Sequence, residues 1–292
     1  VLEDIIKSGA DIVFCVGPQM MPNSLKVAVE HPEVYILNCS LNAPHPYIRT
    51  YYGRMYEAKF LAGMIAGAVT DNERVAYIAD YPIYGMIANI NAFALGVASV
   101  NPRAKVYLAW SKTKDYDRNK FLTENDLHYV SDQDIITPND ASRYFGLYKL
   151  QDGQALNLAM PIWNWGVFYE KLLQSVLAGS YKAEGQEQVK ALNYWWGMSA
   201  GVIDLICSKH VPYGVKRLAD HLKSDITKGE VVPFFGQIYD QKGELKNKGE
   251  HEMKPSDIMK MDWLVDNVVG SIPPMSEFVD NAKMVVELKG VE

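Results

Sequence analysis

The chain has 292 residues, of which 48% are hydrophobic and 22% are charged, a composition typical of a folded globular protein. This length is enough for two domains of about 150 residues each. The formal net charge of −6 and the scattered lysines and arginines argue against a nucleic-acid-binding surface, which needs clustered positive charge. The longest apolar run, residues 60–69, is shorter than the about 18–20 residues that a membrane span needs.

The N-terminal residues and the cysteines of the chain give expectations about its cellular location. The chain begins at Val1 inside a helix-like run and shows no signal peptide, so we expect a natural N-terminus upstream. Cys15, Cys39 and Cys207 are far apart and have no zinc-binding spacing, so they are expected to be free thiols. Free thiols favour a reducing compartment, which keeps a cytoplasmic location open beside an extracytoplasmic one.

Strand-like and helix-like segments alternate along the chain. Short apolar runs that end in turn-forming or polar residues predict strands, and these runs occupy residues 11–16, 33–38, 74–79, 105–110, 127–131 and 156–162. Apolar or small residues at helical spacing predict helices at residues 23–30, 52–69, 85–100 and 165–178. This alternation indicates βαβ units with parallel sheets, and hence an α/β fold.

Some segments carry more specific expectations. Gly63 and Gly67 lie four residues apart in the 52–69 helix, which predicts close packing against a neighbouring element. Gly179 follows the 165–178 helix and is typical of a C-terminal cap. The polar stretches 183–190 and 240–254 are expected to be exposed loops.

The residues that follow strands are the first candidates for a binding site, because ligands of open α/β sheets lie beyond the carboxyl ends of the strands. They include Gln19, Tyr81, Asp132 and Asp134. Only one of Asp132 and Asp134 is expected to face a cleft. Which of the two does so stays open, and so does the alternative that they cap a helix beginning near Pro138.

A second candidate is the segment Trp163, Asn164 and Trp165, which follows an apolar strand. Indole rings stack on a flat heteroaromatic ligand, and an amide between them can read the edge of that ligand. The alternative is that one of these tryptophans covers the core. Trp195 and Trp196 are consecutive, and core packing is the expectation for them.

The sequence offers little that is typical of an enzyme. The sequence contains no GxSxG, HExxH, P-loop or GxGxxG motif. Its six histidines are not spaced as metal ligands. No catalytic residue, metal site or cofactor is therefore predicted, and an enzyme is not expected.

Three segments of the chain are distinctive: residues 51–67 read YYGRMYEAKFLAGMIAG, residues 75–96 read VAYIADYPIYGMIANINAFALG, and residues 162–169 read IWNWGVFY. In this order they resemble segments of the basic membrane protein (Bmp) family, the purine-nucleoside receptors of bacterial ABC importers. The first is similar to the family's YxGRxYExxYLAGxxAG helix. Residues 75–96 resemble the following strand, hinge and NAF helix, and residues 162–169 (IWNWGVFY) resemble the W-x-WG-x-YY segment. Residues 226–243 and 261–273 resemble the two C-terminal segments, so the resemblance covers nearly the whole chain.

The resemblance implies a type I periplasmic-binding-protein fold, with two α/β lobes that each hold a mostly parallel sheet flanked by helices, joined by a three-crossover hinge. The expected N-terminal lobe comprises residues 1–82 and 162–180, with the family's first strand–helix unit lying upstream. The expected C-terminal lobe comprises residues 83–161 and 181–292. A purine nucleobase or nucleoside would be captured between the lobes by hinge closure.

The resemblance also implies individual site residues. Trp163 and Trp165 fall in the family's aromatic segment, and Asn91 falls in its NAF helix, so ligand contacts are expected for all three. The family often has a G-L-K-x-G-type segment whose lysine approaches the ligand. Here that segment, residues 197–201, reads GMSAG, so the lysine contact is lost or replaced.

Three interpretations follow. The first is a monomeric receptor for a small molecule, an extracytoplasmic lipoprotein anchored to the membrane, whose protein partner is an ABC permease and which binds no nucleic acid. The second is an intracellular ligand-sensing domain of a regulator with the same fold. The third is a nucleoside-processing enzyme, which would need a metal-binding acid cluster or a phosphate cradle that the sequence does not offer.

Overall fold

The computed structural model describes residues 1–41, 48–134, 143–179 and 194–289. The chain forms two compact units, described separately below: unit 1 is Val1–Gly53 with Asn164–Trp196, and unit 2 is Arg54–Trp163 with Gly197–Glu292. The chain therefore passes between the units three times, after Gly53, after Trp163 and after Trp196. This is the number of crossovers that the sequence resemblance implies.

The positions of the crossovers differ from the expected lobe boundaries. The first unit ends at Gly53 rather than at residue 82, because α3 (Met55–Val69) and β4 (Arg74–Ala79) are built into the core of unit 2. There α3 packs along α4 (Met86–Val100), and β4 is an inner strand of the sheet. The chain returns to unit 1 at Asn164, and it leaves again only after Trp196.

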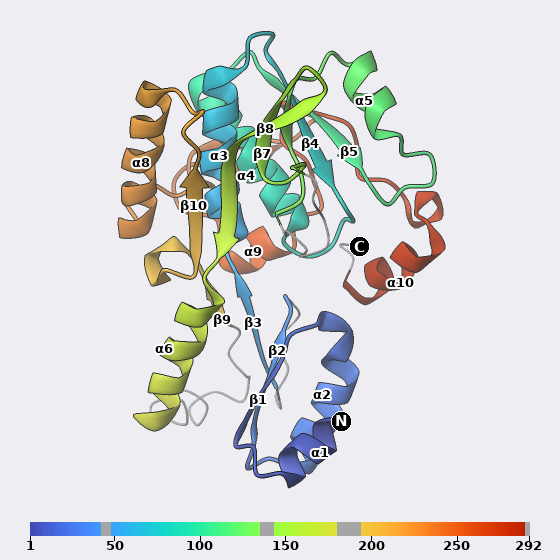
Figure 1. Cartoon of the computed structure of the whole chain (residues 1–292), viewed down its shortest axis with the longest axis vertical. Coiled ribbons are helices and arrows are strands. Elements are labelled where there is room, and N and C mark those ends of the chain that lie inside the picture. Colours follow the sequence, from blue (N-terminus) through green and yellow to red (C-terminus); the bar gives the residue numbers. More distant parts are fainter. Residues whose placement is uncertain (42–47, 135–142, 180–193, 290–292) are drawn as a thin grey trace. The chain divides into compact units, whose positions relative to one another are not determined.

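Unit 1 is a four-stranded parallel sheet with the strand order β1-β2-β3-β9 (Figure 1). The strands are β1 (Ile12–Cys15), β2 (Tyr35–Cys39), β3 (Arg49–Gly53) and β9 (Tyr194–Trp196). The helices are α1 (Leu2–Lys7), α2 (Met21–Glu30), α6 (Trp165–Leu177) and the short 3-10 helix η1 (Pro18–Met20).

Alternation along β1 places helices on both faces of the unit 1 sheet. Val13 and Cys15 pack into the cluster to which α1 and α2 contribute Ile6 and Val27. Phe14, whose side chain points the other way, contacts Tyr169 of α6, with ring centroids 4.6 Å apart. Unit 1 therefore has three layers.

Unit 2 is built on a seven-stranded mixed sheet with the order β10-β8-β7-β6-β4-β5-β13. The strands besides β4 are β5 (Lys105–Trp110), β6 (Tyr129–Ser131), β7 (Leu147–Gln151), β8 (Gln154–Trp163), β10 (Ile203–Cys207) and β13 (Val268–Val269). A separate hairpin pairs β11 (Gln237–Tyr239) with β12 (Leu245–Lys248). The other helices are α5 (Arg118–Glu124), α8 (Tyr213–Lys228), α9 (Pro255–Met259) and α10 (Asp280–Lys289), with 3-10 turns η2 (Met198–Ala200) and η3 (Met275–Glu277).

Within this sheet β6, β4, β5 and β13 run parallel to one another, so their carboxyl ends meet at one edge. The strand β7 is antiparallel to β6, and β8 is antiparallel to β7, so β8 points the same way as β6. We call this shared edge the carboxyl edge of unit 2. Ligands of open α/β sheets bind beyond the carboxyl ends of the strands, so this edge is the candidate location of a ligand site.

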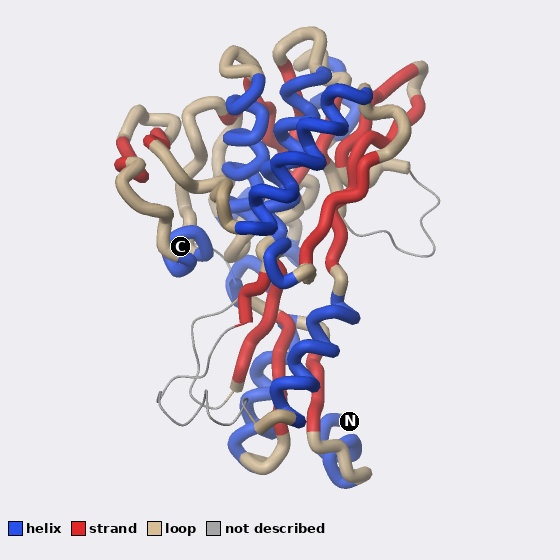
Figure 2. The backbone as a smooth tube through the Cα atoms, turned by 90° about the vertical axis from the view of Figure 1, so that its left-hand side faces the viewer, coloured by secondary structure: helices blue, strands red, loops and turns tan. Residues whose placement is uncertain are grey.

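Helices cover both faces of the unit 2 sheet as well. Tyr77 of β4 faces the α3–α4 pair, where its ring meets Phe93 edge-to-face at 5.2 Å. Ala76 and Ile78, which point the other way, pack in a cluster with Leu122 of α5. Figure 2 shows long helices lying against the strands of this unit.

The close approach of α3 and α4 depends on glycine. A Cβ on Gly63 would lie 2.0 Å from the carbonyl oxygen of Phe93, and a Cβ on Gly96 would lie 2.0 Å from that of Phe60. A Cβ on Gly67 would lie 2.7 Å from the carbonyl oxygen of Val97. The prediction that Gly63 and Gly67 permit close packing is confirmed.

Most predicted elements are confirmed, with differences at their ends. The strands at 74–79 and 105–110 have the predicted bounds. Residues 52 and 53, expected to begin a helix, lie instead in β3, where they pair with Trp195 and Trp196 of β9. Residues 240–254, expected to be an exposed loop, contain β12 and the buried Asp240. The stretch 183–190 lies outside the described residues.

Candidate functional site

Three polar groups meet at the carboxyl edge of unit 2. β4, β5 and β6 end at Ala79, Trp110 and Ser131, and the next residues in the chain are Asp80, Ser111 and Asp132. Because β4 lies between β6 and β5, these residues are neighbours across the edge. Of the post-strand residues named from the sequence, Tyr81, Asp132 and Asp134 follow strands that end at this edge, whereas Gln19, Asn164 and Trp165 belong to unit 1.

Asp80 and Tyr81 lie at the centre of this edge, and both are half-buried. Oδ1 of Asp80 accepts a short hydrogen bond from the hydroxyl of Ser111, which links the ends of β4 and β5. Its Oδ2 accepts no hydrogen bond from any described residue. Burial, with a contribution from Asp80, raises the pKa of Tyr81, so this phenol stays protonated and can donate.

Asp132 is buried and held by a structural network. Its Oδ2 lies 2.6 Å from Nη2 of Arg118 and accepts the hydroxyl of Tyr148 at 3.1 Å, while its Oδ1 accepts the N–H of Gln133. The guanidinium of Arg118 also lies over the ring of Tyr144, 4.4 Å from its centroid. With both oxygens engaged, Asp132 links α5 to β6 and β7.

Asp134 has a different partner. Its Oδ1 accepts a hydrogen bond of 2.6 Å from Nζ of Lys59, which belongs to α3, and its side chain remains 14% exposed. The partners of Asp132 and Asp134 thus come from helices on opposite faces of the sheet, although residues two apart in a regular strand would share a face; the chain leaves β6 at Ser131 and bends at Asp134. Of the two, Asp134 keeps an oxygen that accepts no hydrogen bond from the described residues. The helix expected near Pro138 lies outside them.

Trp163 ends β8 at the same edge of unit 2. It is half-buried and lies opposite Ile203 of β10. Its indole N–H is buried and finds no acceptor among the described residues. A buried donor without a partner costs about 1–3 kcal/mol, so this N–H suits an acceptor supplied by a ligand or water.

Asn164 and Trp165 belong to unit 1, where they begin α6. The carbonyl of Asn164 accepts the N–H groups of Val167 and Phe168, as expected for a helix start. Trp165 is half-buried and meets Tyr51 edge-to-face at 5.7 Å. Trp165 is therefore part of an aromatic cluster of unit 1 whose other members are Phe14, Tyr51, Phe168, Tyr169, Tyr194 and Trp196.

Two of the expected site residues lie elsewhere. Gln19 is exposed in the η1 turn after β1, and its side chain folds over Gly17. Asn91 is fully buried in α4, where Nδ2 donates to the carbonyl of Trp263 at 2.8 Å and Oδ1 accepts the N–H of Val265 at 3.0 Å. Instead of facing a ligand, as expected, the Asn91 amide fixes the segment that contains Trp263.

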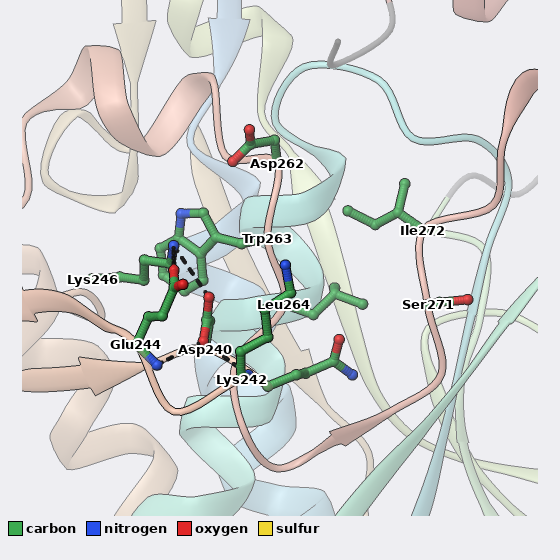
Figure 3. Close-up of a pocket in the computed structure, with 10 residues that line it drawn as sticks. Asp240, Lys242, Glu244, Lys246, Asp262, Trp263, Leu264, Ser271 and Ile272 are labelled. Atoms are coloured by element: carbon green, nitrogen blue, oxygen red, sulfur yellow. Dashed lines mark hydrogen bonds and ion pairs between the residues drawn. The ribbon is translucent and has the colours of Figure 1, made fainter.

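That segment lines a pocket of about 310 Å³ in unit 2 (Figure 3). Three of its charged groups pair with one another: Lys246 lies 3.1 Å from Asp240 and 2.8 Å from Glu244. Asp240 also accepts the N–H groups of Lys242 and Glu244, so it closes the β11–β12 turn. The interactions drawn in Figure 3 thus engage Asp240, Glu244 and Lys246 with one another and with the β11–β12 turn.

The GMSAG segment follows the third crossover. Residues 198–200 form η2, and the N–H of Met198 donates to Oε2 of Glu57 at 2.6 Å. Burial raises the pKa of Glu57, while the bond from Met198 and the nearby Arg54 lower it. In place of the lysine of the related family, this segment therefore presents a backbone N–H to a buried carboxylate of α3.

Sequence reasoning missed Lys59, Arg118, Ser131 and Tyr148. A signal existed for Lys59, since a lysine in an otherwise apolar helix is expected to be paired when that helix is buried. Within the described ranges, no group of three or more His, Cys, Asp or Glu residues could hold a metal ion. Among the same residues, no helix has both the length and the apolarity that a membrane crossing requires.

Comparison with known proteins agrees with this picture. Residues 1–144 match the model of the Bmp family, described as PnrA-like ABC transporter substrate-binding proteins. The resemblance inferred from the sequence segments is thereby confirmed. A purine-binding protein of Brucella abortus is 26% identical over 285 residues, which cover 93% of this chain and 79% of that protein.

A second relative differs in the ligand for which it is named. A protein of Haloferax volcanii, named as an ABC transporter glucose-binding protein, is 29% identical over 215 residues, or 69% of this chain. The match spans 53% of that protein's own length.

Solved structures show the same fold. A transcriptional activator of the comK gene from Bacillus halodurans has a TM-score of 0.59 at 15% identity, over 80% of this chain and 83% of that one. ABC transporter solute-binding proteins from Conexibacter woesei and Aeropyrum pernix have TM-scores of 0.54 and 0.53 at 17% and 15% identity. They cover 78% and 79% of this chain, and 81% and 79% of their own. At these identities the likeness establishes the fold alone.

Proposed function

We propose that this chain, which over residues 1–144 belongs to the PnrA-like family of ABC transporter substrate-binding proteins, captures a purine nucleobase or nucleoside for import. The family makes it a solute-binding protein whose partners are a small molecule and an ABC permease. Proteins of this family generally work outside the cytoplasm. Capture by hinge closure and anchoring as a lipoprotein are parts of the proposal.

The observation that carries the proposal is the pair Asp80 and Asp134 at the carboxyl edge of unit 2. Each carboxylate has one oxygen bonded to a protein side chain and one that accepts no hydrogen bond from the described residues. A carboxylate is an acceptor only, so the pair suits a ligand that offers N–H or O–H donors. The base and the ribose of a purine nucleoside both offer such donors.

Trp163 favours a ligand that is flat and that carries hydrogen-bond acceptors in addition to donors. Its buried indole N–H lacks an acceptor in the described part of the chain, and Trp163 ends β8, which runs in the same direction as β6 and β4. Purine rings present both a π face and ring-nitrogen acceptors, and stacking on an aromatic side chain contributes about 1–3 kcal/mol per base. The combination fits a purine better than a purely hydroxylated ligand.

A sugar such as glucose is the second candidate, because the Haloferax relative is named for glucose and sugar hydroxyls also donate to carboxylates. The purine-binding relative matches a larger share of this chain, 93% against 69%, which favours the purine. An intracellular sensor domain remains an alternative role for the same ligand site, and no catalytic step is proposed.

The test begins with native mass spectrometry of the purified protein, followed by calorimetry with adenine, hypoxanthine, adenosine, inosine, guanosine and glucose. We expect at least one purine to bind with one-to-one stoichiometry and glucose not to bind. Binding of glucose alone would reassign the protein to sugars. Release of free base from a nucleoside during the incubation would make it an enzyme.

A further inference from the structure

A lysine lies buried in the middle of an apolar helix. Lys59 of α3 is flanked by Ala58 and Phe60, and its side chain is 1% exposed. Burial of an ammonium group costs several kcal/mol or more unless the group is paired and hydrogen-bonded. The packing of the helix alone therefore does not explain a lysine at residue 59.

The contacts of Lys59 all lead to the carboxyl edge. Its Nζ donates to Oδ1 of Asp134 at 2.6 Å and to the hydroxyl of Ser131 at 3.1 Å, and it lies 5.0 Å from the ring centroid of Tyr77. Ser131 ends β6, and Tyr77 belongs to β4. The ammonium group thus connects α3 to β4 and to the end of β6, the two strands beside the candidate site.

We infer that Lys59 is a positioning residue of the ligand site: it keeps the Asp134 carboxylate ionised and fixes one of its oxygens, so that the other is presented to the ligand as an acceptor. The inference rests on the proposed function, because it assigns Asp134 to the same site. Lys59 itself touches protein groups and acts through Asp134.

The electrostatics explain why Asp134 needs this partner. Burial raises the pKa of Asp134, and the nearby carboxylates of Asp132 and Asp80 raise it further, whereas Lys59 lowers it through its charge and its hydrogen bond. The phenol of Tyr77, on the same side, stays neutral because burial raises its pKa. Without Lys59, burial and the carboxylates of Asp132 and Asp80 favour the protonated form of Asp134.

Lys59 also sets the charge that a ligand meets. Arg118 neutralises Asp132, and Lys59 neutralises Asp134, so in the part of the chain that the structure describes Asp80 alone of the three acids has no cationic partner. A site with one uncompensated charge and two free carboxylate oxygens suits a neutral molecule with several donors. Removal of Lys59 would leave a more acidic site, which would either take up a proton or favour a cationic ligand.

The test compares Lys59→Met and Lys59→Gln with the wild type, using the purine that binds the wild type in calorimetry at several values from about pH 6 to about pH 9. The methionine is close in shape but has no charge, and the glutamine can still donate a hydrogen bond. We expect both variants to bind about tenfold more weakly near neutral pH, the scale of one lost hydrogen bond to a charged group, and to recover as the pH rises. Lys26→Met, which removes an exposed lysine of α2 in unit 1, is the matched control and should stay within about twofold of the wild type.

Lys59→Met with the affinity and pH profile of the wild type would overturn the inference. If Lys59→Met does not fold, the double variant K59M/D134N removes both buried charges; it should fold but bind weakly at every pH, and full affinity would overturn the inference. If the wild type binds no purine, the proposed function fails, and the effect of Lys59 on Asp134 is then tested without a ligand. Carboxyl NMR titration of the ligand-free protein should then give a higher Asp134 midpoint in Lys59→Met, and an unchanged midpoint would contradict the role.

Discussion

The carboxylate of Glu57 accepts the backbone N–H of Met198 at 2.6 Å, in the place where a side chain on residue 197 would otherwise lie. A Cβ on Gly197 would come within 2.3 Å of Oε2 of Glu57. Glu57 follows the first crossover and Met198 follows the third, so the contact joins two returning segments inside unit 2.

This contact predicts a cost for Gly197→Ala and for Glu57→Ala. The first forces the carboxylate away from the Met198 N–H, and the second leaves that buried N–H without an acceptor. Each should lower the free energy of unfolding by about 1–3 kcal/mol in urea titration. Glu57→Gln keeps an acceptor and should cost less than Glu57→Ala. If Gly197→Ala has the stability of the wild type, residues 197–201 can move to accommodate the methyl group, and this prediction is wrong.

The same carboxyl predicts a dependence of stability on pH. Burial raises the pKa of Glu57 above its ordinary value of 4.5, so between that value and the raised one the folded state binds more protons than the unfolded state. The contribution of Glu57 to the free energy of unfolding therefore falls as the pH rises through this window. In Glu57→Gln this contribution should be missing from a pH series of urea titrations. An identical pH slope in both proteins would contradict the assignment.

The packing of α3 on α4 predicts that Gly63→Ala and Gly96→Ala are destabilising. Each added methyl group would lie 2.0 Å from a backbone carbonyl oxygen, so the helices would have to move apart, at about 1–3 kcal/mol. Gly214→Ala in α8 is the matched control, since nothing lies within 4 Å of its added Cβ. It should be neutral or stabilising by about 0.4–1 kcal/mol in thermal or urea unfolding. Equal effects at all three positions would argue against the close approach.

Asn91 is predicted to act on stability and not on ligand selection. Asn91→Ala leaves the Val265 N–H and the Trp263 carbonyl without their partner and should lower the free energy of unfolding by about 1–3 kcal/mol. Asn89→Ala, on the same helix and half-buried, is the control and should be nearly neutral. Calorimetry on the folded fraction should give a similar Kd for both. A loss of affinity specific to Asn91→Ala would restore Asn91 as a ligand contact.

Trp163 is predicted to contribute to binding directly. Trp163→Ala should weaken the binding of the purine by about 1–3 kcal/mol, the scale of base–aromatic stacking. Trp163→Phe keeps an aromatic face but loses the N–H donor, so it should fall between the alanine variant and the wild type. Unchanged calorimetric affinity in Trp163→Ala would remove this residue from the site. Trp165→Ala, by contrast, is expected to lower the free energy of unfolding, since Trp165 packs on Tyr51 and Tyr169.

The local pattern of the sequence predicts much of the fold because the inner strands are short apolar runs bounded by turns. β4 and β5 illustrate this, and so does the glycine spacing of α3. What the pattern does not predict depends on distant partners. Residues 52 and 53 read as the start of a helix, but they extend β3 because β9, more than a hundred residues later, pairs with them. β7 was missed for a similar reason, since its residues form a strand by pairing with both β6 and β8.

The candidate site shows the same division. The post-strand rule brings Tyr81, Asp132 and Asp134 to one edge without any knowledge of tertiary contacts. The partners that decide what each acid can do, Arg118 and Lys59, come from helices far away in the sequence. For that reason the sequence could not distinguish Asp132, which is engaged on both oxygens, from Asp134, which is not.

The pairing of Tyr51 with Tyr194 has a consequence for biosynthesis. When the ribosome has completed residues 1–53, the outer edge of β3 has no neighbour, and its partner strand appears only after all of residues 54–163 and α6. An unpaired edge strand is a template for association with other chains, and such long-range pairing slows folding. The nascent chain must therefore carry an open sheet edge while residues 54–193 are synthesised, and a chaperone that shields β3 should raise the yield of folded protein.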